Sequence, residues 1–186
     1  MATRFAQDTV PLTYDDYAKL PKDGWRYEIV EGDLLMSPAP KTKHQRVQMR
    51  LYDLLQPFIA GNRLGELFVA PQDVVLDQHT VLQPDLFFVA ASRQNIVTEL
   101  NIQGPPDLVV EVESDYDERA DWLRKLRAYD RHGVKELWHV RPDPRVVDVY
   151  RRVAEHLDQV ERPQAHDRLT TPLLPGLSIA LDPIWA

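Results

Sequence analysis

The sequence predicts an α/β fold in which a mixed β-sheet is flanked by helices, with an N-terminal helix and hairpin. Three observations lead to this prediction. Short segments rich in β-branched and aromatic residues, separated by prolines and aspartates, fill the centre of the chain. Two longer segments carry apolar residues at helical spacing. The 186 residues contain no linker, repeat or low-complexity tract, so we expect one domain over residues 1–186.

The N-terminal part is expected to form a short helix and a hairpin. Thr13 and Asp16 have the spacing of a capped helix start, and the helix would close before Pro21. Residues 26–30 and 34–37 then read as two strands around a tight turn, in which glycine can adopt positive φ.

A helix of about four turns is predicted next. Thr42 is a candidate N-cap and Pro57 should limit the last turn. The apolar positions of this helix are Val47, Leu51, Leu54, Leu55 and Phe58. Three short strands should follow, at residues 67–70, 74–76 and 86–89.

The segment Asp107–Glu113 is the most informative strand. Its period of two places Leu108, Val110 and Val112 on one face, and Val109, Glu111 and Glu113 on the other. Such an apolar strand is expected in the middle of a sheet.

The last part of the chain is predicted to contain a helix, a pair of strands and a short final strand. The helix should run over about residues 117–132 and end at Gly133. The strands are expected at residues 136–140, 146–150 and 177–181.

Composition excludes several function classes. The chain has no cysteine, which removes disulfides, Cys-ligated zinc and thiol nucleophiles. The longest apolar run has six residues and the N-terminus lacks a signal-peptide core, so we expect a cytoplasmic protein with no membrane span. The net charge of −7 argues against non-specific coating of nucleic acid, although a local basic patch could still bind a polyanion.

The acidic residues of the strands suggest a metal site. Carboxylates at Glu111 and Glu113 would be partly buried and would need a cation, a basic side chain or water as compensation. Asp85 opens another apolar strand and could converge with them on one ion. Hard oxygen ligands suit Mg²⁺ or Mn²⁺. A solvated outer face of the sheet is the alternative for the two glutamates.

The second predicted helix supplies basic residues. Lys125 lies at the edge of an apolar arc formed by Trp122, Leu123, Leu126 and Tyr129. Its ammonium either points inward or extends past the core into water. Four arginines, Arg119, Arg124, Arg127 and Arg131, could form a basic surface or ordinary surface ion pairs. Among six histidines without zinc-ligand spacing, His44 is the one candidate we retain.

A family resemblance rests on eight motifs that occur in order along residues 13–181. They are Arg26-Tyr-Glu-Ile-Val-Glu-Gly-Asp-Leu34, Ser37-Pro38 followed by His44, Asp73-Val-Val-Leu-Asp77, Gln83-Pro-Asp85, Pro106-Asp-Leu-Val-Val-Glu-Val112, Lys125-Leu-Arg-Ala-Tyr129 with Gly133-Val134, Glu136-Leu-Trp138, and Pro172-Leu-Leu-Pro-Gly-Leu177. With these motifs the chain resembles the Uma-two family of restriction-type endonucleases, within the PD-(D/E)XK nuclease superfamily.

The resemblance implies a restriction-endonuclease-like core with a divalent-metal site that hydrolyses a phosphodiester. Pro84-Asp85 matches the PD element and Glu111 the second acid, and both would hold Mg²⁺ or Mn²⁺. The superfamily's usual lysine position is occupied by Glu113, and the resemblance places the lysine on the next helix, at Lys125. Glu28 resembles an additional upstream acid. Possible accessory residues are Glu113, His44 and Tyr129.

The predicted function is therefore a metal-dependent endonuclease that acts on nucleic acid, with DNA favoured, as a homo-oligomer (dimer or higher). The chain departs from the family after Glu111, where it reads Glu113-Ser-Asp-Tyr-Asp117. The extra negative charge could recruit a second ion or repel the phosphate. Two alternatives stay open: a non-catalytic module for oligomerisation or protein binding, and a phosphate-ester hydrolase for small molecules.

Overall fold

The computed structural model describes residues 10–114 and 119–186 and has the mixed α/β architecture that the sequence predicts. The strands divide over two larger sheets and one small pair, rather than one sheet. The six-stranded sheet has the order β11 (His156–Glu161), β10 (Val146–Val153), β9 (Glu136–Arg141), β8 (Leu108–Val112), β6 (Leu86–Ala90) and β3 (Gly65–Val69). The five-stranded sheet has the order β2 (Asp33–Ser37), β1 (Arg26–Val30), β5 (Thr80–Leu82), β4 (Val74–Asp77) and β7 (Ile102–Gln103).

Strand β8 lies inside the six-stranded sheet, as its apolar pattern predicts. It pairs in parallel with β9 and antiparallel with β6. Leu108, Val110 and Val112 belong to one hydrophobic core, whereas Val109 belongs to a second core on the opposite face. The period of two therefore separates the faces correctly and turns Glu111 toward the side of Val109.

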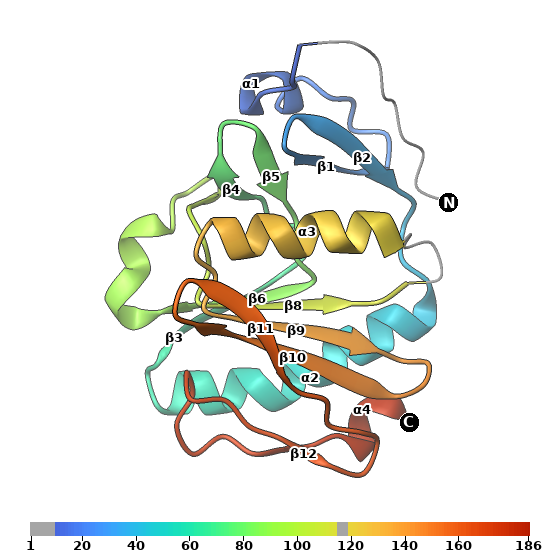
Figure 1. Cartoon of the computed structure of the whole chain (residues 1–186), viewed down its shortest axis with the longest axis vertical. Coiled ribbons are helices and arrows are strands. Elements are labelled where there is room, and N and C mark those ends of the chain that lie inside the picture. Colours follow the sequence, from blue (N-terminus) through green and yellow to red (C-terminus); the bar gives the residue numbers. More distant parts are fainter. Residues whose placement is uncertain (1–9, 115–118) are drawn as a thin grey trace.

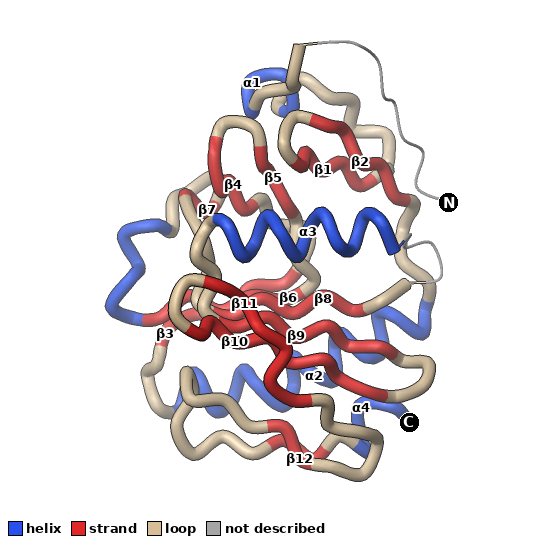
Figure 2. Tube along the Cα trace, in the orientation of Figure 1, coloured by secondary structure: helices blue, strands red, loops and turns tan. Residues whose placement is uncertain are grey.

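Two long helices cover the two faces of this sheet (Figure 1). Helix α2 (Thr42–Gly61) packs on the face of Val110, and helix α3 (Arg119–Arg131) packs on the face of Val109. The second core also takes residues from β1, β2, β4 and β5, so α3 is packed between the two sheets, as Figure 2 shows. Residues of both larger sheets and of both long helices line the pocket in which the candidate site lies.

The N-terminal helix and hairpin are confirmed. Helix α1 (Tyr14–Tyr17) starts with a capping box between Thr13 and Asp16. Strands β1 and β2 pair antiparallel around Glu31 and Gly32, which both have positive φ. Gly32 also lies close to another segment, since a Cβ there would be 2.4 Å from Pro11 Cβ.

Helix α2 differs from the prediction at both ends. Lys41 is its N-cap residue and Thr42 is its first helical residue, so Thr42 does not cap the helix. Pro57 lies inside the helix and does not end it. Burial of Leu55 and Ile59 on either side of Pro57 stabilises this turn, which offsets the hydrogen bond that proline cannot donate.

Several C-terminal elements also differ. Strand β11 was not predicted because only Leu157 of its residues is buried, which leaves no apolar alternation to detect. The final strand, expected at residues 177–181, is shorter in the structure: it is β13 (Ile179–Ala180), which pairs with β12 (Arg168–Leu169). The short helix α4 (Asp182–Trp185) follows it. The 3-10 helix η1 (Ala91–Ile96) was likewise not predicted.

Helix α3 keeps its predicted face with one exception: Leu123 is 39% exposed and does not belong to the apolar arc. The predicted helix start at residue 117, and most of the family departure after Glu113, lie outside the described residues. No helix in the described ranges is long and apolar enough to cross a membrane.

Candidate active site

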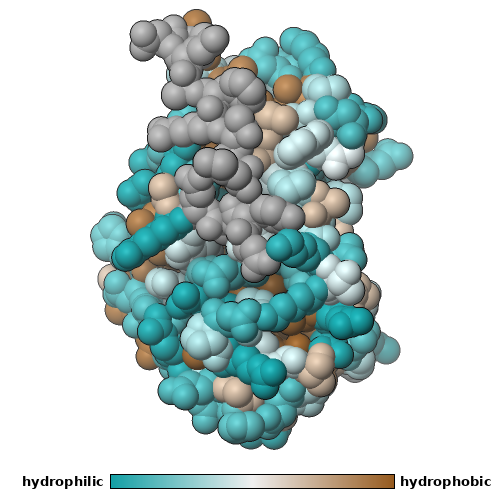
Figure 3. Space-filling model, turned by 90° about the vertical axis from the view of Figure 1, so that its right-hand side faces the viewer, coloured by the Kyte–Doolittle hydropathy of each residue, from teal (hydrophilic) through white to brown (hydrophobic). Residues whose placement is uncertain are grey.

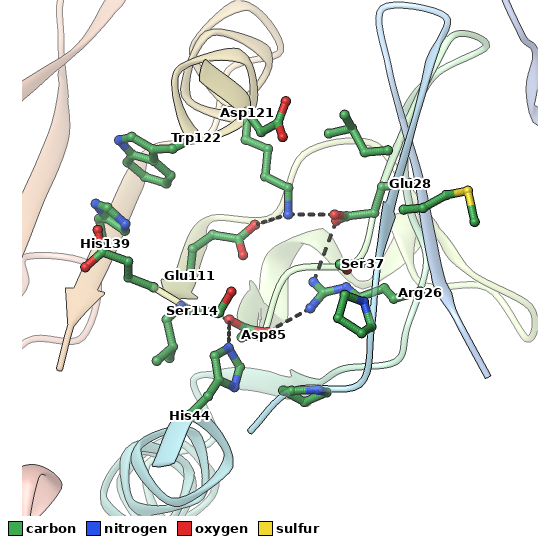
Figure 4. Close-up of a pocket in the computed structure, with 17 residues that line it drawn as sticks. Arg26, Glu28, Ser37, His44, Asp85, Glu111, Ser114, Asp121, Trp122 and His139 are labelled. Carbon is green, nitrogen blue, oxygen red and sulfur yellow. Dashed lines mark hydrogen bonds and ion pairs between the residues drawn. The ribbon is translucent and has the colours of Figure 1, made fainter. Parts of the chain in front are cut away.

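Three buried carboxylates from three separate strand segments converge on one pocket. Glu28 comes from β1, Asp85 directly precedes β6, and Glu111 comes from β8. Their exposed fractions are 4%, 2% and 7%, respectively. All three line a pocket of about 70 Å³ together with Lys125 of α3 and His44 of α2 (Figure 4). The sequence prediction that Asp85 and Glu111 lie together is therefore consistent with the geometry.

Asp85 is held as a carboxylate by groups on both of its oxygens. Arg26 Nη1 lies 3.1 Å from Oδ1, and His44 Nε2 lies 3.0 Å from Oδ2. The backbone N–H of Val112 also donates to Oδ2, at 2.8 Å. Burial opposes ionisation, but the hydrogen bond with His44 and the charge of Arg26 outweigh it and lower the pKa of Asp85. Asp85 is consequently negative at neutral pH.

Glu111 is the less compensated acid. The Tyr129 hydroxyl donates to Oε1 at 2.6 Å, and Lys125 Nζ lies 3.4 Å from the same oxygen. Burial raises the pKa of Glu111 to about 7; Lys125 opposes this rise, and the negative charges of Asp85 and Glu28 add to it. An additional cation in the pocket would therefore favour the ionised form of this side chain.

Lys125 points inward, which resolves the two alternatives left open by the sequence. Its Nζ lies 2.7 Å from Glu28 Oε2, and the side chain is 15% exposed. Burial opposes the charged form, but Glu111 and Glu28 outweigh it and raise the pKa of Lys125. The lysine therefore bridges two acids of the pocket as a permanent cation.

Glu28 is ionised for a related reason. Arg26 Nη2 lies 3.6 Å from its Oε1, which also accepts a 2.8 Å hydrogen bond from the backbone N–H of Gln83. Burial opposes ionisation, but the charges of Lys125 and Arg26 outweigh it and lower the pKa of Glu28. Figure 4 shows the resulting alternation of acids and bases across the pocket.

The accessory candidates occupy different positions. Glu113 lines the same pocket as Glu111 and pairs with Arg141 at 3.2 Å. His44 lies in the pocket beside Asp85, whereas Tyr129 is a fully buried core residue behind Glu111. At one wall of the pocket the Trp122 and His139 rings stack, with centroids 3.7 Å apart.

Two of the four arginines of α3 form ion pairs with acidic residues of the N-terminal hairpin. Arg124 pairs with Asp33 at 2.6 Å, and Arg131 pairs with Glu31 at 2.7 Å. Sequence reasoning also missed Arg26. The strand period would have found it, because positions 26 and 28 share one face of β1.

The pocket chemistry fits a divalent cation held by few protein ligands. Asp85 and Glu111 offer hard carboxylate oxygens, and Mg²⁺ commonly takes one or two carboxylates and keeps several waters. A volume of about 70 Å³ accommodates such waters. Within residues 10–114 and 119–186, no three His, Asp or Glu side chains are grouped to hold a metal ion by themselves. Arg26 Nη1 donates to Asp85 Oδ1, so a cation bound at that oxygen would compete with Arg26.

Comparison with known proteins places the chain in a nuclease context. A family described as "Putative restriction endonuclease" (Uma2) matches residues 14–182, which confirms the resemblance predicted from the motifs. The crystal structure of a putative nuclease belonging to DUF820 from Anabaena variabilis is similar in fold, with a TM-score of 0.77. The two chains are 21% identical, and the match covers 94% of this chain and 98% of that one. No curated protein matches the sequence significantly.

Proposed function

Because the chain belongs to the Uma2 family of putative restriction endonucleases, we propose that it is a divalent-metal-dependent endonuclease that hydrolyses phosphodiester bonds of DNA. The observation that carries this proposal is the meeting of Asp85, Glu111 and Lys125 in one buried pocket. Two carboxylates can hold the metal, and a lysine beside them can stabilise the negative charge that develops on the phosphate.

Asp85 and Glu111 are the proposed metal ligands, and Glu28 is an additional acid of the site. When bound, Mg²⁺ or Mn²⁺ supplies a Lewis acid that polarises the phosphate and lowers the pKa of a water molecule. Lys125 is already fixed by Glu28 and Glu111, so its charge is preorganised toward a phosphate in the pocket. Tyr129 orients Glu111 through its hydrogen bond.

The remaining properties of the proposed enzyme come from the sequence. We expect a single domain, a homo-oligomer of two or more chains, and a cytoplasmic location. A dimer would bring two pockets to the two strands of a duplex.

A non-catalytic module is the second candidate, and one observation favours it. Arg26 and Lys125 already give the acids ion pairs within the chain. An internally paired cluster of this kind can serve as a purely structural polar network.

Calorimetric titration with Mn²⁺, followed by incubation with plasmid DNA, separates the two candidates. The proposed enzyme binds Mn²⁺ and nicks or cleaves the plasmid, and Asp85→Asn and Glu111→Gln lose both properties while they remain folded. Asp53→Asn, which changes an exposed acid of α2, is the matched control and retains both. Full cleavage by both site variants, or a wild-type protein that binds no Mn²⁺, would reject the enzyme and favour the module.

A further inference from the structure

A row of basic side chains follows one face of α2 beside the candidate site. Lys43, Arg46 and Arg50 are spaced three and four residues apart, which places them on one side of the helix. Arg145, from the turn between β9 and β10, joins them around a surface hollow. We call these four residues the basic row. Asp143 is the one aspartate or glutamate among the described residues that line the same hollow.

The basic row is continuous with the acidic pocket. Lys43 also lines a second hollow, which it shares with His44, Glu113 and Ser114. These last three residues line the acidic pocket as well. Hydrophilic side chains cover most of the lower half of the face drawn in Figure 3. His44, Glu113 and Ser114 thus connect the hollow beside Lys43 with the pocket of Asp85 and Glu111.

The charges of the basic row are poorly neutralised by the protein. Arg46 and Arg145 form no ion pair with any described residue. Lys43 pairs with Asp143, but the two side chains are 58% and 83% exposed, and such exposed pairs contribute little and exchange readily. Arg50 donates a hydrogen bond to an oxygen of Ala186 and pairs with no aspartate or glutamate side chain of the described residues. An anionic partner would therefore gain from this surface.

We propose that the basic row binds the phosphodiester backbone of DNA and directs it to the acidic pocket. This inference rests on the proposed endonuclease function and names the surface through which the substrate approaches. The seven-residue separation of Lys43 and Arg50 corresponds to about 10 Å along the helix axis. That length matches about three phosphates of one strand, at about 3.4 Å per phosphate along a duplex. Lys43, Arg46 and Arg50 can thus reach phosphates of one strand over this length.

The test measures DNA binding without cleavage. The full chain is titrated in EDTA against a fluorescent duplex, and against a single strand of the same length, between 50 and 200 mM salt. In the triple variant Lys43→Gln/Arg46→Gln/Arg50→Gln, we expect affinity to fall at least about tenfold at the low-salt end. The slope of log affinity against log salt should shrink by about 2 to 3 on the duplex, because each lost phosphate contact contributes about 0.9.

The matched control removes the same charge elsewhere. Lys19→Gln/Lys22→Gln/Arg127→Gln changes three exposed residues of other segments and should leave the slope unchanged. Arg46→Gln alone is the variant least able to disturb the fold, and it should reduce the duplex slope by about 1. Thermal unfolding confirms that all variants are folded.

Three results would overturn the inference. If both basic-row variants keep the DNA affinity and the salt slope of the wild type, DNA binds elsewhere. If the control triple variant loses as much affinity and slope as the basic-row triple variant, the effect is one of total charge only. In either case, plasmid cleavage by the wild type with Mn²⁺ would leave the proposed function standing. A wild-type protein that neither binds nor cleaves DNA would overturn both.

Discussion

Arg26 Nη1 lies 3.1 Å from Oδ1 of Asp85, which places a guanidinium inside the cluster of acids. The same side chain also pairs with Glu28. Without Arg26, two buried carboxylates would lose a counter-ion. Arg26 is thus both a stabilising partner of the metal-free site and a competitor for the oxygen that the proposed metal needs.

Replacing Arg26 should therefore exchange stability for metal affinity. In Arg26→Gln we expect the free energy of unfolding in EDTA to fall by about 3 kcal/mol, since breaking a buried ion pair leaves uncompensated charge. We expect Mn²⁺ to bind more tightly than in the wild type, because the competing cation is gone. Urea unfolding and calorimetric titration measure the two quantities.

Arg124→Gln is the control for Arg26. It breaks the ion pair with Asp33, whose side chain is 43% exposed, so the loss of stability should be smaller and Mn²⁺ affinity should not change. Unchanged or weaker Mn²⁺ binding in Arg26→Gln would contradict the competition.

Lys125 should affect the rate of cleavage more than metal binding. In Lys125→Met the charge directed at the phosphate is lost, and we expect the rate to fall by about 100-fold or more, as for other preorganised electrostatic groups. The Kd for Mn²⁺ should change little. Single-turnover cleavage measures the rate, and calorimetry measures the Kd for Mn²⁺. Lys135→Met is the control, because Lys135 pairs with Asp107 away from the pocket and its loss should change neither quantity. Equal weakening of both quantities would instead assign Lys125 to holding the acids in place.

Metal binding should depend on pH through Glu111. Its pKa of about 7 means that the side chain is mostly protonated below pH 7, so a cation must displace the proton there. Mn²⁺ affinity should rise about tenfold per pH unit below the pKa and level off above it. Titrations at pH 6 in two buffers of different ionisation enthalpy should detect about one released proton. A wild type that binds Mn²⁺ at pH 6 without releasing a proton would refute the role of Glu111.

The positions of Asp85 and Glu111 were predictable because strand alternation and the start of an apolar strand are local properties of the sequence. The direction of Lys125 was not. A side chain at the edge of a helix face can point to either side. The direction of Lys125 depends on its ion pair with Glu28, which lies almost a hundred residues earlier in the sequence, in the five-stranded sheet. Strand alternation places Arg26 on the same face as Glu28, but its contact with Asp85 joins residues far apart in the sequence and is seen only in the structure.

The location of the basic surface could not be predicted from the sequence either, because it depends on contacts between distant segments. Four arginines on α3 suggested a cationic face, but Arg124 and Arg131 pair with acids of the N-terminal hairpin. Lys43, Arg46 and Arg50 have the ordinary pattern of an exposed helix face in the sequence. Only the packing of α2 against the sheet places them around one hollow, next to the second hollow that Lys43 shares with residues of the pocket.

The hydrogen bond from Tyr129 to Glu111 should favour the ionised form of that acid, against the effect of burial. A hydrogen-bond donor to a carboxylate favours its charged form, so Tyr129→Phe should raise the pKa of Glu111 further. The pH above which Mn²⁺ affinity becomes constant should therefore be higher in this variant than in the wild type. Loss of the 2.6 Å bond should also lower the free energy of unfolding by about 1 to 3 kcal/mol. Tyr52→Phe is the control, since no hydrogen bond joins the Tyr52 hydroxyl to the described residues although its ring packs against the core. Identical pH profiles for Tyr129→Phe and the wild type would mean that burial and the neighbouring charges alone determine the pKa of Glu111.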